Sequence, residues 1–338
     1  MQRVVYSSLG KRSEDIELGP GIGLDNGVIS IGRGQVMILT VDPVSVIPAF
    51  GMKMSAWLSV HLIASDYTTS GSDPEYALFT YNFPAEMRDT DREEYVRAIG
   101  AECDNLGVTI AGGHTGSYPG SGLTVIGSGS MLGFAAENGY VAPSMAHAGD
   151  AIVMTKHAAI EATCSLATSF PAFVESKAGA VNMRRAREQV KLCSTVADAR
   201  AARSVGIGAQ GVSAMHDATE GGVLGALYEM AIASEKRFVV HTGGIPVAPE
   251  SRAVCEAFGL DPLKTMGEGA LLITCLPKDV RPLREVLGRA GVESAEIGSV
   301  ERGEGLVMVD SHGHRRAFAP CEDGYWSAYS RALGRRLQ

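Results

Sequence analysis

The spacing of apolar and polar residues along the chain predicts strands and helices in alternating order. Short apolar runs predict strands over 37–41, 76–83, 107–111, 123–133, 151–155, 238–241, 270–275 and 305–309. Apolar positions that recur with a helical period predict helices over about 52–66, 90–106, 184–205, 219–234, 250–258 and 280–290. This mixture predicts a protein of the α/β or α+β class.

Length and composition predict a globular protein with two domains. The chain has 338 residues, and a new unit begins near Gly149-Asp150, so we expect domains at 1–148 and 149–338. Hydrophobic residues make up 45% and charged residues 20% of the sequence, as in soluble proteins. The net charge is −8 and no long basic stripe occurs, which argues against a nucleic-acid partner.

The sequence also contains no targeting or membrane signal. No run of 18 apolar residues predicts a membrane span, and the first residues lack the apolar segment of a secretory signal. None of the six cysteines forms a C-x-x-C pair, so the spacing predicts neither a zinc site nor a compact disulfide framework. We therefore expect a cytoplasmic protein with reduced thiols.

The segment from Met215 to Ala231 contains the most informative pattern. Its apolar residues form one helix face, and Gly221 and Gly222 lie at the start of that helix. Glycines there let a ligand approach closely, and the free amides of a helix N-terminus favour an anion such as phosphate. The alternative is a capping box, with Asp217 at the cap and Glu220 three residues later. On this segment alone the capping box is the simpler interpretation.

Other residues can bind metal or ligand. Asp25, Asp42 and Asp66 lie at the ends of predicted elements beside short residues, and magnesium prefers such carboxylate oxygens. His114 lies in a Gly-Gly-His-Thr-Gly loop after a predicted strand. The alternative is that each Asp is a turn or cap residue and that His114 is only a hydrogen-bonded structural residue.

Two familiar nucleotide motifs are missing. No G-x-x-x-x-G-K-[ST] sequence occurs, which argues against a P-loop ATPase. The cluster Gly19-x-Gly21-x-Gly23 follows Ser13-Glu-Asp-Ile-Glu-Leu18 rather than an apolar strand. The context of a dinucleotide-binding loop is therefore absent, which argues against a dinucleotide-dependent oxidoreductase.

Taken in order, five segments resemble the AIR synthetase (PurM-like) superfamily, and among its members most of all the hydrogenase maturation factor HypE. The segments are Gly21-Ile-Gly-Leu-Asp-Asn-Gly-Val-Ile29, Leu39-Thr-Val-Asp42, Ser65-Asp66 with Ser70-Gly71, Gly112-Gly-His-Thr115 and Asp217-Ala-Thr-Glu-Gly-Gly222. The resemblance covers nearly the whole chain. Five segments in register are specific for the superfamily, but not for one activity.

The resemblance implies a two-domain fold in which two N-terminal sheets pair into a barrel at a homodimer interface. It implies ATP and magnesium as cofactors, and transfer of the γ-phosphate to a carbonyl, amide or similar oxygen of a small-molecule acceptor. Such transfer depends on positioning and charge neutralisation. By the same resemblance, the metal ligands are Asp25, Asp42 and Asp66, the catalytic residues are Asp217 and His114, and the nucleotide-binding residues are Gly21, Gly23, Gly112, Gly113, Thr115, Thr219, Gly221 and Gly222.

Three positions depart from the family pattern. Leu24, His114 and Glu220 stand where the family has Asp, an acidic residue and, in HypE, Arg. The last thiol, Cys321, lies 17 residues before Gln338, so we expect no self-modification of a terminal cysteine. The alternative function is therefore a non-catalytic nucleotide-binding maturation or regulatory protein. We expect His114 and Asp217 to face one cleft, His114 from the glycine-rich loop and Asp217 from the start of the helix at about 219.

Overall fold

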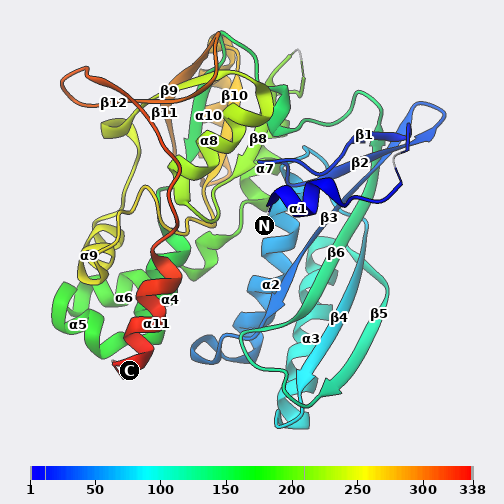
Figure 1. Ribbon diagram of the computed structural model, residues 1–338, viewed down its shortest axis with the longest axis vertical. Coiled ribbons are helices and arrows are strands. Elements are labelled where there is room, and N and C mark those ends of the chain that lie inside the picture. The colour runs from blue at the N-terminus through cyan, green and yellow to red at the C-terminus, as the bar shows by residue number, and fades with distance from the viewer. Residues whose placement is uncertain (1, 12, 209, 336–338) are drawn as a thin grey trace.

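The computed structural model describes residues 2–11, 13–208 and 210–335, which form two β-sheets and their helices (Figure 1). The N-terminal sheet has six strands in the order β1-β2-β3-β6-β4-β5. Its strands are β1 (Ile16–Leu18), β2 (Gly27–Gly32), β3 (Gln35–Ser45), β4 (Tyr76–Pro84), β5 (Thr109–Tyr118) and β6 (Val125–Ala136). A short helix, α1 (Gln2–Ser7), and a 3-10 turn, η1 (Pro48–Phe50), accompany this sheet.

Helices cover only one face of the N-terminal sheet. Strand residues alternate between its two faces, and the inward set that includes Ala77, Phe79 and Tyr81 is buried under α2 (Gly51–Thr68) and α3 (Asp89–Leu106). The opposite face is open and apolar. Its exposed side chains include Tyr76, Leu78 and Phe134.

The C-terminal sheet has seven strands in the order β13-β12-β9-β11-β7-β10-β8. Its strands are β7 (Ala151–Thr155), β8 (Val212–Asp217), β9 (Arg237–His241), β10 (Leu271–Cys275), β11 (Ser294–Glu301), β12 (Gly305–Val309) and β13 (Arg315–Ala317). Helix α8 (Gly222–Ser234) packs on one face, and α7 (Val196–Arg203) and α10 (Val280–Arg289) pack on the other. This sheet is therefore buried on both sides.

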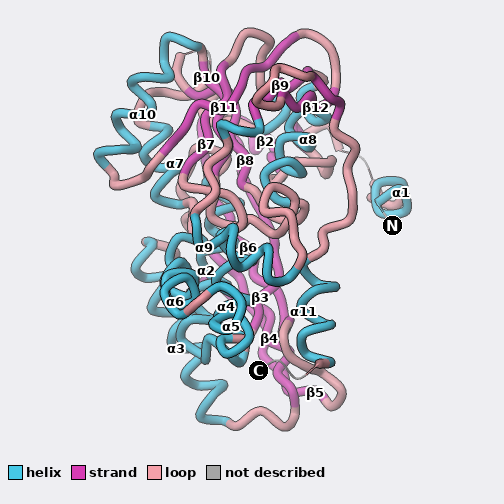
Figure 2. The backbone as a smooth tube through the Cα atoms, turned by 90° about the vertical axis from the view of Figure 1, so that its left-hand side faces the viewer, coloured by secondary structure: helices cyan, strands magenta, loops and turns pink. Residues whose placement is uncertain are grey.

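A group of helices joins the two sheets. It comprises α4 (Ile160–Ser169), α5 (Pro171–Ala178), α6 (Ala180–Glu188), α9 (Pro249–Phe258) and α11 (Tyr325–Gly334). These helices share an apolar cluster and lie below the seven-stranded sheet and beside the N-terminal one (Figure 1, Figure 2). The remaining 3-10 turns are η2 (Pro143–Met145), η3 (Gln189–Cys193), η4 (Thr242–Gly244) and η5 (Pro277–Asp279).

The expected fold class is confirmed, but three local predictions are wrong. The helix predicted over 184–205 is divided into α6, η3 and α7. Its interruption lies where the Lys156 ammonium binds the carbonyls of Leu192 and Ser194. The predicted loop at 112–116 belongs to β5. Asp217 ends β8 and is not in a loop.

The predicted domain boundary at 148/149 falls in the connection between β6 and β7, and we retain it as a proposed boundary. Several polar contacts cross from one sheet region to the other, and ion pairs are among them. Arg200 and Arg203 of α7 each bind Asp73 at 2.6 Å, and His216 of β8 binds Asp25. Within the described residues, no helix is both long and apolar enough to cross a lipid bilayer.

Candidate functional site

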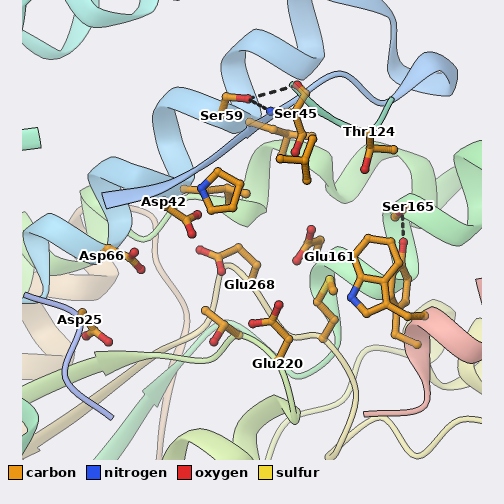
Figure 3. A pocket seen from close by; sticks show the side chains of 18 of the residues that line it. Asp25, Asp42, Ser45, Ser59, Asp66, Thr124, Glu161, Ser165, Glu220 and Glu268 are labelled. Atoms are coloured by element: carbon orange, nitrogen blue, oxygen red, sulfur yellow. Dashed lines mark hydrogen bonds between the residues drawn. The ribbon is translucent and has the colours of Figure 1, made fainter. Parts of the chain in front are cut away.

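A cavity of about 520 Å³ lies between the two sheets and the group of joining helices. Figure 3 shows Asp25, Asp42 and Asp66 at one end, Glu161 and Ser165 at the other, and Glu220 and Glu268 between them. We call Asp25, Asp42, Asp66, His216 and Glu268, together with Asp217, which is buried beside Asp25 behind the cavity lining, the acidic end. The cavity brings together the three predicted metal ligands from a loop, from β3 and from the last turn of α2.

His216 connects the two sides of the acidic end. Its Nδ1 lies 2.8 Å from Asp25 Oδ1, and its Nε2 lies 3.2 Å from Glu229 Oε2. Burial alone would lower the pKa of His216, but Asp25 and Glu229 outweigh it and hold that pKa well above its usual range. A protonated imidazole donates both N–H groups, so His216 fixes Asp25 against the C-terminal domain.

Gly23 lets the loop that contains Asp25 approach α8. Its φ of +70° lies in the left-handed region, and a Cβ at this position would meet the Cβ of Glu229 at 2.7 Å. Any larger residue would push the loop away from the helix. Gly23 lines the cavity, whereas Gly21, also predicted to bind the nucleotide, does not.

Asp217 is fully buried, and neither of its carboxylate oxygens makes a hydrogen bond of ordinary geometry to a described residue, although the neighbouring Glu268 carboxyl acts to lower its pKa. Oxygen or nitrogen atoms of Asp25, His216 and Asp217 all lie within 4.8 Å of one another. Burial and the charge of Asp25 raise the pKa of Asp217 to about 7. A buried carboxylate without a donor is costly, so this position calls for a proton or a cation.

The other carboxyl groups strengthen this negative field. Burial, and then the charge of Glu220, raise the pKa of Asp42 to about 7. Burial, and then the charge of Asp217, raise the pKa values of Asp66 and Glu268 well above their usual range. Neither Lys nor Arg is among the described residues that line the cavity.

These groups fit magnesium. Mg²⁺ prefers carboxylate oxygens, and it is usually held by one or two carboxylates together with water and phosphate. Asp25, Asp42 and Asp66 line the cavity. Asp217 is buried beside Asp25, just behind this lining, so the four carboxylates together provide such donors. A phosphate group would need this cation, because the carboxylates would otherwise repel it.

His114 does not reach this cavity within one chain. It lies on the edge strand β5, is exposed, and contacts the Tyr118 hydroxyl at 2.8 Å. In the sheet, His114 of β5 pairs with Thr80 of β4, Thr80 pairs with Ser128 of β6, and Ser128 pairs with Pro43 of β3, which lines the cavity. His114 is therefore three strand spacings, or about 14 Å, away from Pro43. The prediction that His114 and Asp217 face one cleft is therefore wrong within one chain. Strand β5 also contains three predicted nucleotide-binding residues that do not line the cavity, Gly112, Gly113 and Thr115.

The N-terminus of α8 is not a free phosphate site. Gly221 is its N-cap, and the Gly221 amide donates to Asp323 Oδ2 at 2.9 Å. The amides of Gly222 and Leu224 donate to backbone carbonyls. A Cβ on Gly222 would meet the Thr265 carbonyl at 2.6 Å, so the glycine serves packing. The anion-binding interpretation of Gly221 and Gly222 is wrong.

The capping-box interpretation is also wrong, because Asp217 belongs to β8 and α8 begins at Gly222. Glu220 and Thr219 instead line the cavity. Sequence reasoning missed Glu161, His216 and Glu268 as site residues. Two signals were present: His216 adjoins Asp217, and Glu268 precedes the predicted strand over 270–275.

Comparison with known proteins gives the same fold and places the chain in a family. A curated relative, carbamoyl dehydratase HypE of Rhizobium leguminosarum bv. viciae, is 27% identical over 309 residues, which cover 87% of this chain and 82% of that protein. The solved HypE–HypF complex matches with a TM-score of 0.74 at 18% identity, covering 95% of this chain and 99% of that chain. AaThiL complexed with AMPPCP and TMP matches with a TM-score of 0.72 at 16% identity, covering 95% and 94%.

The family models match both parts of the chain. The model for the N-terminal domain of AIR synthase related proteins matches residues 23–135, and the model for the C-terminal domain matches residues 147–311. Together they cover the strands of both sheets except β1 and β13, and they include all six residues of the acidic end. The chain is a member of the AIR synthase related protein family.

Proposed function

We propose that the protein is an ATP- and magnesium-dependent enzyme that transfers a phosphoryl group to a carbonyl, amide or similar oxygen of a small molecule. The observation that carries this proposal is Asp217, a fully buried carboxylate without a donor, beside Asp25 and His216. The family membership supports it. So does the solved structure of AaThiL, which holds AMPPCP, a triphosphate analogue of ATP.

Magnesium held at the acidic end would neutralise phosphate charge during transfer. The residues of this chain have three tasks there. Asp25, Asp42, Asp66 and Asp217 provide oxygen donors, and His216 holds Asp25 in position. Burial and the charge of Asp217 raise the pKa of Glu268, which favours its protonated form and suits it to exchange a proton with a ligand oxygen.

The binding half of this proposal is tested by Asp217→Asn. Asn keeps the shape but removes the charge, so we expect magnesium-dependent ATP affinity to fall at least about tenfold. The protein without magnesium should be as stable as the wild type or more stable, because a repelled buried charge is gone. Calorimetry and thermal unfolding measure the two effects. The matched control is Asp104→Asn, because Asp104 is an exposed residue of α3.

Unchanged ATP affinity in Asp217→Asn would remove the basis of the metal site. Lower stability without magnesium would instead identify Asp217 as a purely structural residue. ADP release that depends on magnesium, measured with and without metabolite pools, separates the enzyme from a non-catalytic nucleotide-binding protein. ADP release that occurs only when a metabolite fraction is added would show that this fraction contains the phosphoryl acceptor.

We also propose that the protein forms a homodimer through the open face of the N-terminal sheet. Tyr76, Leu78 and Phe134 are each at least 37% exposed there. An apolar sheet face with an exposed edge strand favours association. A second copy on this face would also cover β5, the strand on which His114 lies.

A further inference from the structure

The end of the cavity opposite the acidic end is aromatic. Tyr325, Trp326 and Tyr329 of α11 line it, and Trp326 is 51% exposed. The Trp326 ring lies 5.0 Å from that of Tyr325 and 6.2 Å from that of Tyr329, with both pairs in edge-to-face geometry. We call these three side chains, with Glu161 and Ser165, the aromatic end.

Hydrogen bonds hold this aromatic surface in place before any ligand arrives. The Tyr325 hydroxyl lies 2.6 Å from Ser165 Oγ, and the Tyr329 hydroxyl donates to Ser169 Oγ at 3.2 Å. Both contacts fix α11 to α4. A preformed aromatic surface binds a flat ring without the entropy cost of ordering its own side chains.

Glu161 provides a polar group beside the rings. Its carboxyl faces the cavity (Figure 3), and no described residue makes a hydrogen bond to it. Burial, and then the charges of Glu220 and Asp42, raise the pKa of Glu161 to about 8. Near neutral pH a protonated carboxyl both donates and accepts. An amino group next to a ring nitrogen presents the complementary pair.

The charges around the aromatic end disfavour an anionic group. No Lys or Arg is among the described lining residues, and Glu161 lies within the field of the acidic end. A carboxylate or phosphate would therefore be repelled here unless a cation accompanied it. A flat ring with hydrogen-bond donors meets no such repulsion.

We propose that the aromatic end binds a planar nitrogen heterocycle bearing an amino group, with its ring against Trp326 and its amino group at Glu161. This rests on the proposed function, because the ring would occupy the same cavity as the magnesium-bound phosphate. Either the base of the nucleotide or the acceptor substrate can supply this ring, and the experiment separates the two.

The probe is 4-aminopyrimidine, and the readout is fluorescence. The chain has two tryptophans, and Trp57 is buried on α2 beneath the Lys191 ammonium. In the Trp57→Phe variant, Trp326 is the only tryptophan left, so the tryptophan fluorescence comes from the aromatic end. We expect saturable quenching by 4-aminopyrimidine and roughly tenfold weaker binding of pyrimidine, which lacks the amino group. Equilibrium dialysis with the wild-type protein repeats the measurement without the Trp57 substitution.

Two variants and one control locate the binding. Glu161→Leu and Trp326→Ala should each weaken 4-aminopyrimidine binding to wild-type protein by roughly tenfold. Leu333→Ala on the exposed side of the same helix should leave it unchanged. The proposal would be overturned if pyrimidine bound as tightly as 4-aminopyrimidine, or if Glu161→Leu or Trp326→Ala left the 4-aminopyrimidine affinity unchanged. The absence of saturable binding would also overturn it.

Saturating magnesium and ATP then identify the source of the ring. Unchanged 4-aminopyrimidine affinity assigns the aromatic end to the acceptor. Competition assigns it to the base of the nucleotide, and Trp326→Ala should then weaken binding of ATP but not of magnesium tripolyphosphate. If 4-aminopyrimidine binds as expected while calorimetry detects no ATP binding, the aromatic site stands and the proposed function fails.

Discussion

At the residue scale, His216 decides the geometry of the site. It lies between two carboxylates on different elements, Asp25 in the N-terminal loop and Glu229 on α8. The imidazolium thus offsets part of the repulsion among the acidic side chains and keeps Asp25 near Asp217. Few other side chains can serve both carboxylates, because the two ring nitrogens point in different directions.

We expect His216→Gln to lose both stability and metal affinity. The positive charge disappears and one carboxylate loses its partner, which costs on the order of 1–3 kcal/mol of unfolding free energy. Urea unfolding measures the stability, and Mn²⁺ binding followed by electron paramagnetic resonance measures the metal site. His241→Gln, at the exposed end of β9, is the control. Wild-type Mn²⁺ affinity in His216→Gln would contradict this positioning role.

The residue scale also shows where sequence reasoning succeeded. Asp25, Asp42 and Asp66 were singled out by their motif segments, and the structure brings them into one cavity. His114 was singled out in the same way, yet it lies on the edge strand three strands away from β3. A motif gives the residue type and its local setting, but it does not give the distance across a sheet.

At the scale of elements, β5 and the open sheet face are unusual. Nearly every residue of β5 is exposed, and its outer edge is unpaired in the described chain. An exposed strand edge next to apolar side chains is unfavourable for a monomer in water. A second copy of the chain would cover both features.

We therefore expect Leu78→Arg to convert a dimer into a monomer. Leu78 lies on β4 within the open face and is 40% exposed, so an arginine there would bury a charge at the interface. Light scattering at micromolar concentration measures the change in mass. Val181→Arg, at an exposed position of α6, should leave the mass unchanged. A monomeric wild-type protein would contradict the proposed dimer.

At the scale of the whole molecule, an ion-pair cluster at Asp73 is one of the links between the two domains. Asp73 lies between α2 and β4, and Arg200 and Arg203 of α7 each bind it at 2.6 Å. Burial alone would raise the pKa of Asp73, but the hydrogen bonds and charges of both arginines outweigh it and lower that pKa below 3.8. The cluster therefore stabilises the folded protein when Asp73 is ionised.

The pH dependence follows from this lowered pKa. The stabilisation is present above the ordinary pKa of 3.8 and is lost as the pH falls through the lowered value. Since Asp73 is partly exposed, we expect Asp73→Asn to cost only about 1 kcal/mol at pH 7. The difference from wild type in urea unfolding should shrink towards zero when the pH is taken from 7 to below the lowered pKa of Asp73. A difference that is the same at both pH values would contradict the role of the ionised pair.

The sequence by itself determined most of the elements and the family. Apolar periodicity located β7 and β12 and most of the length of α2, α3 and α9, because burial of one face imposes a local repeat. It failed where a distant group intervened. The Lys156 ammonium binds the carbonyls of Leu192 and Ser194 at the point where the helix predicted over 184–205 is divided, and no local pattern contains that contact.

Tertiary structure alone decided which candidate residues form the site. Asp217 is a metal-ligand candidate because β8 ends beside the loop of Asp25, and Asp323 occupies the helix terminus that the sequence offered to phosphate. Glu161 and Trp326 share a cavity although 165 positions separate them in the sequence. Local sequence determines the backbone of each element, whereas charge, burial and ligand contacts depend on which elements meet.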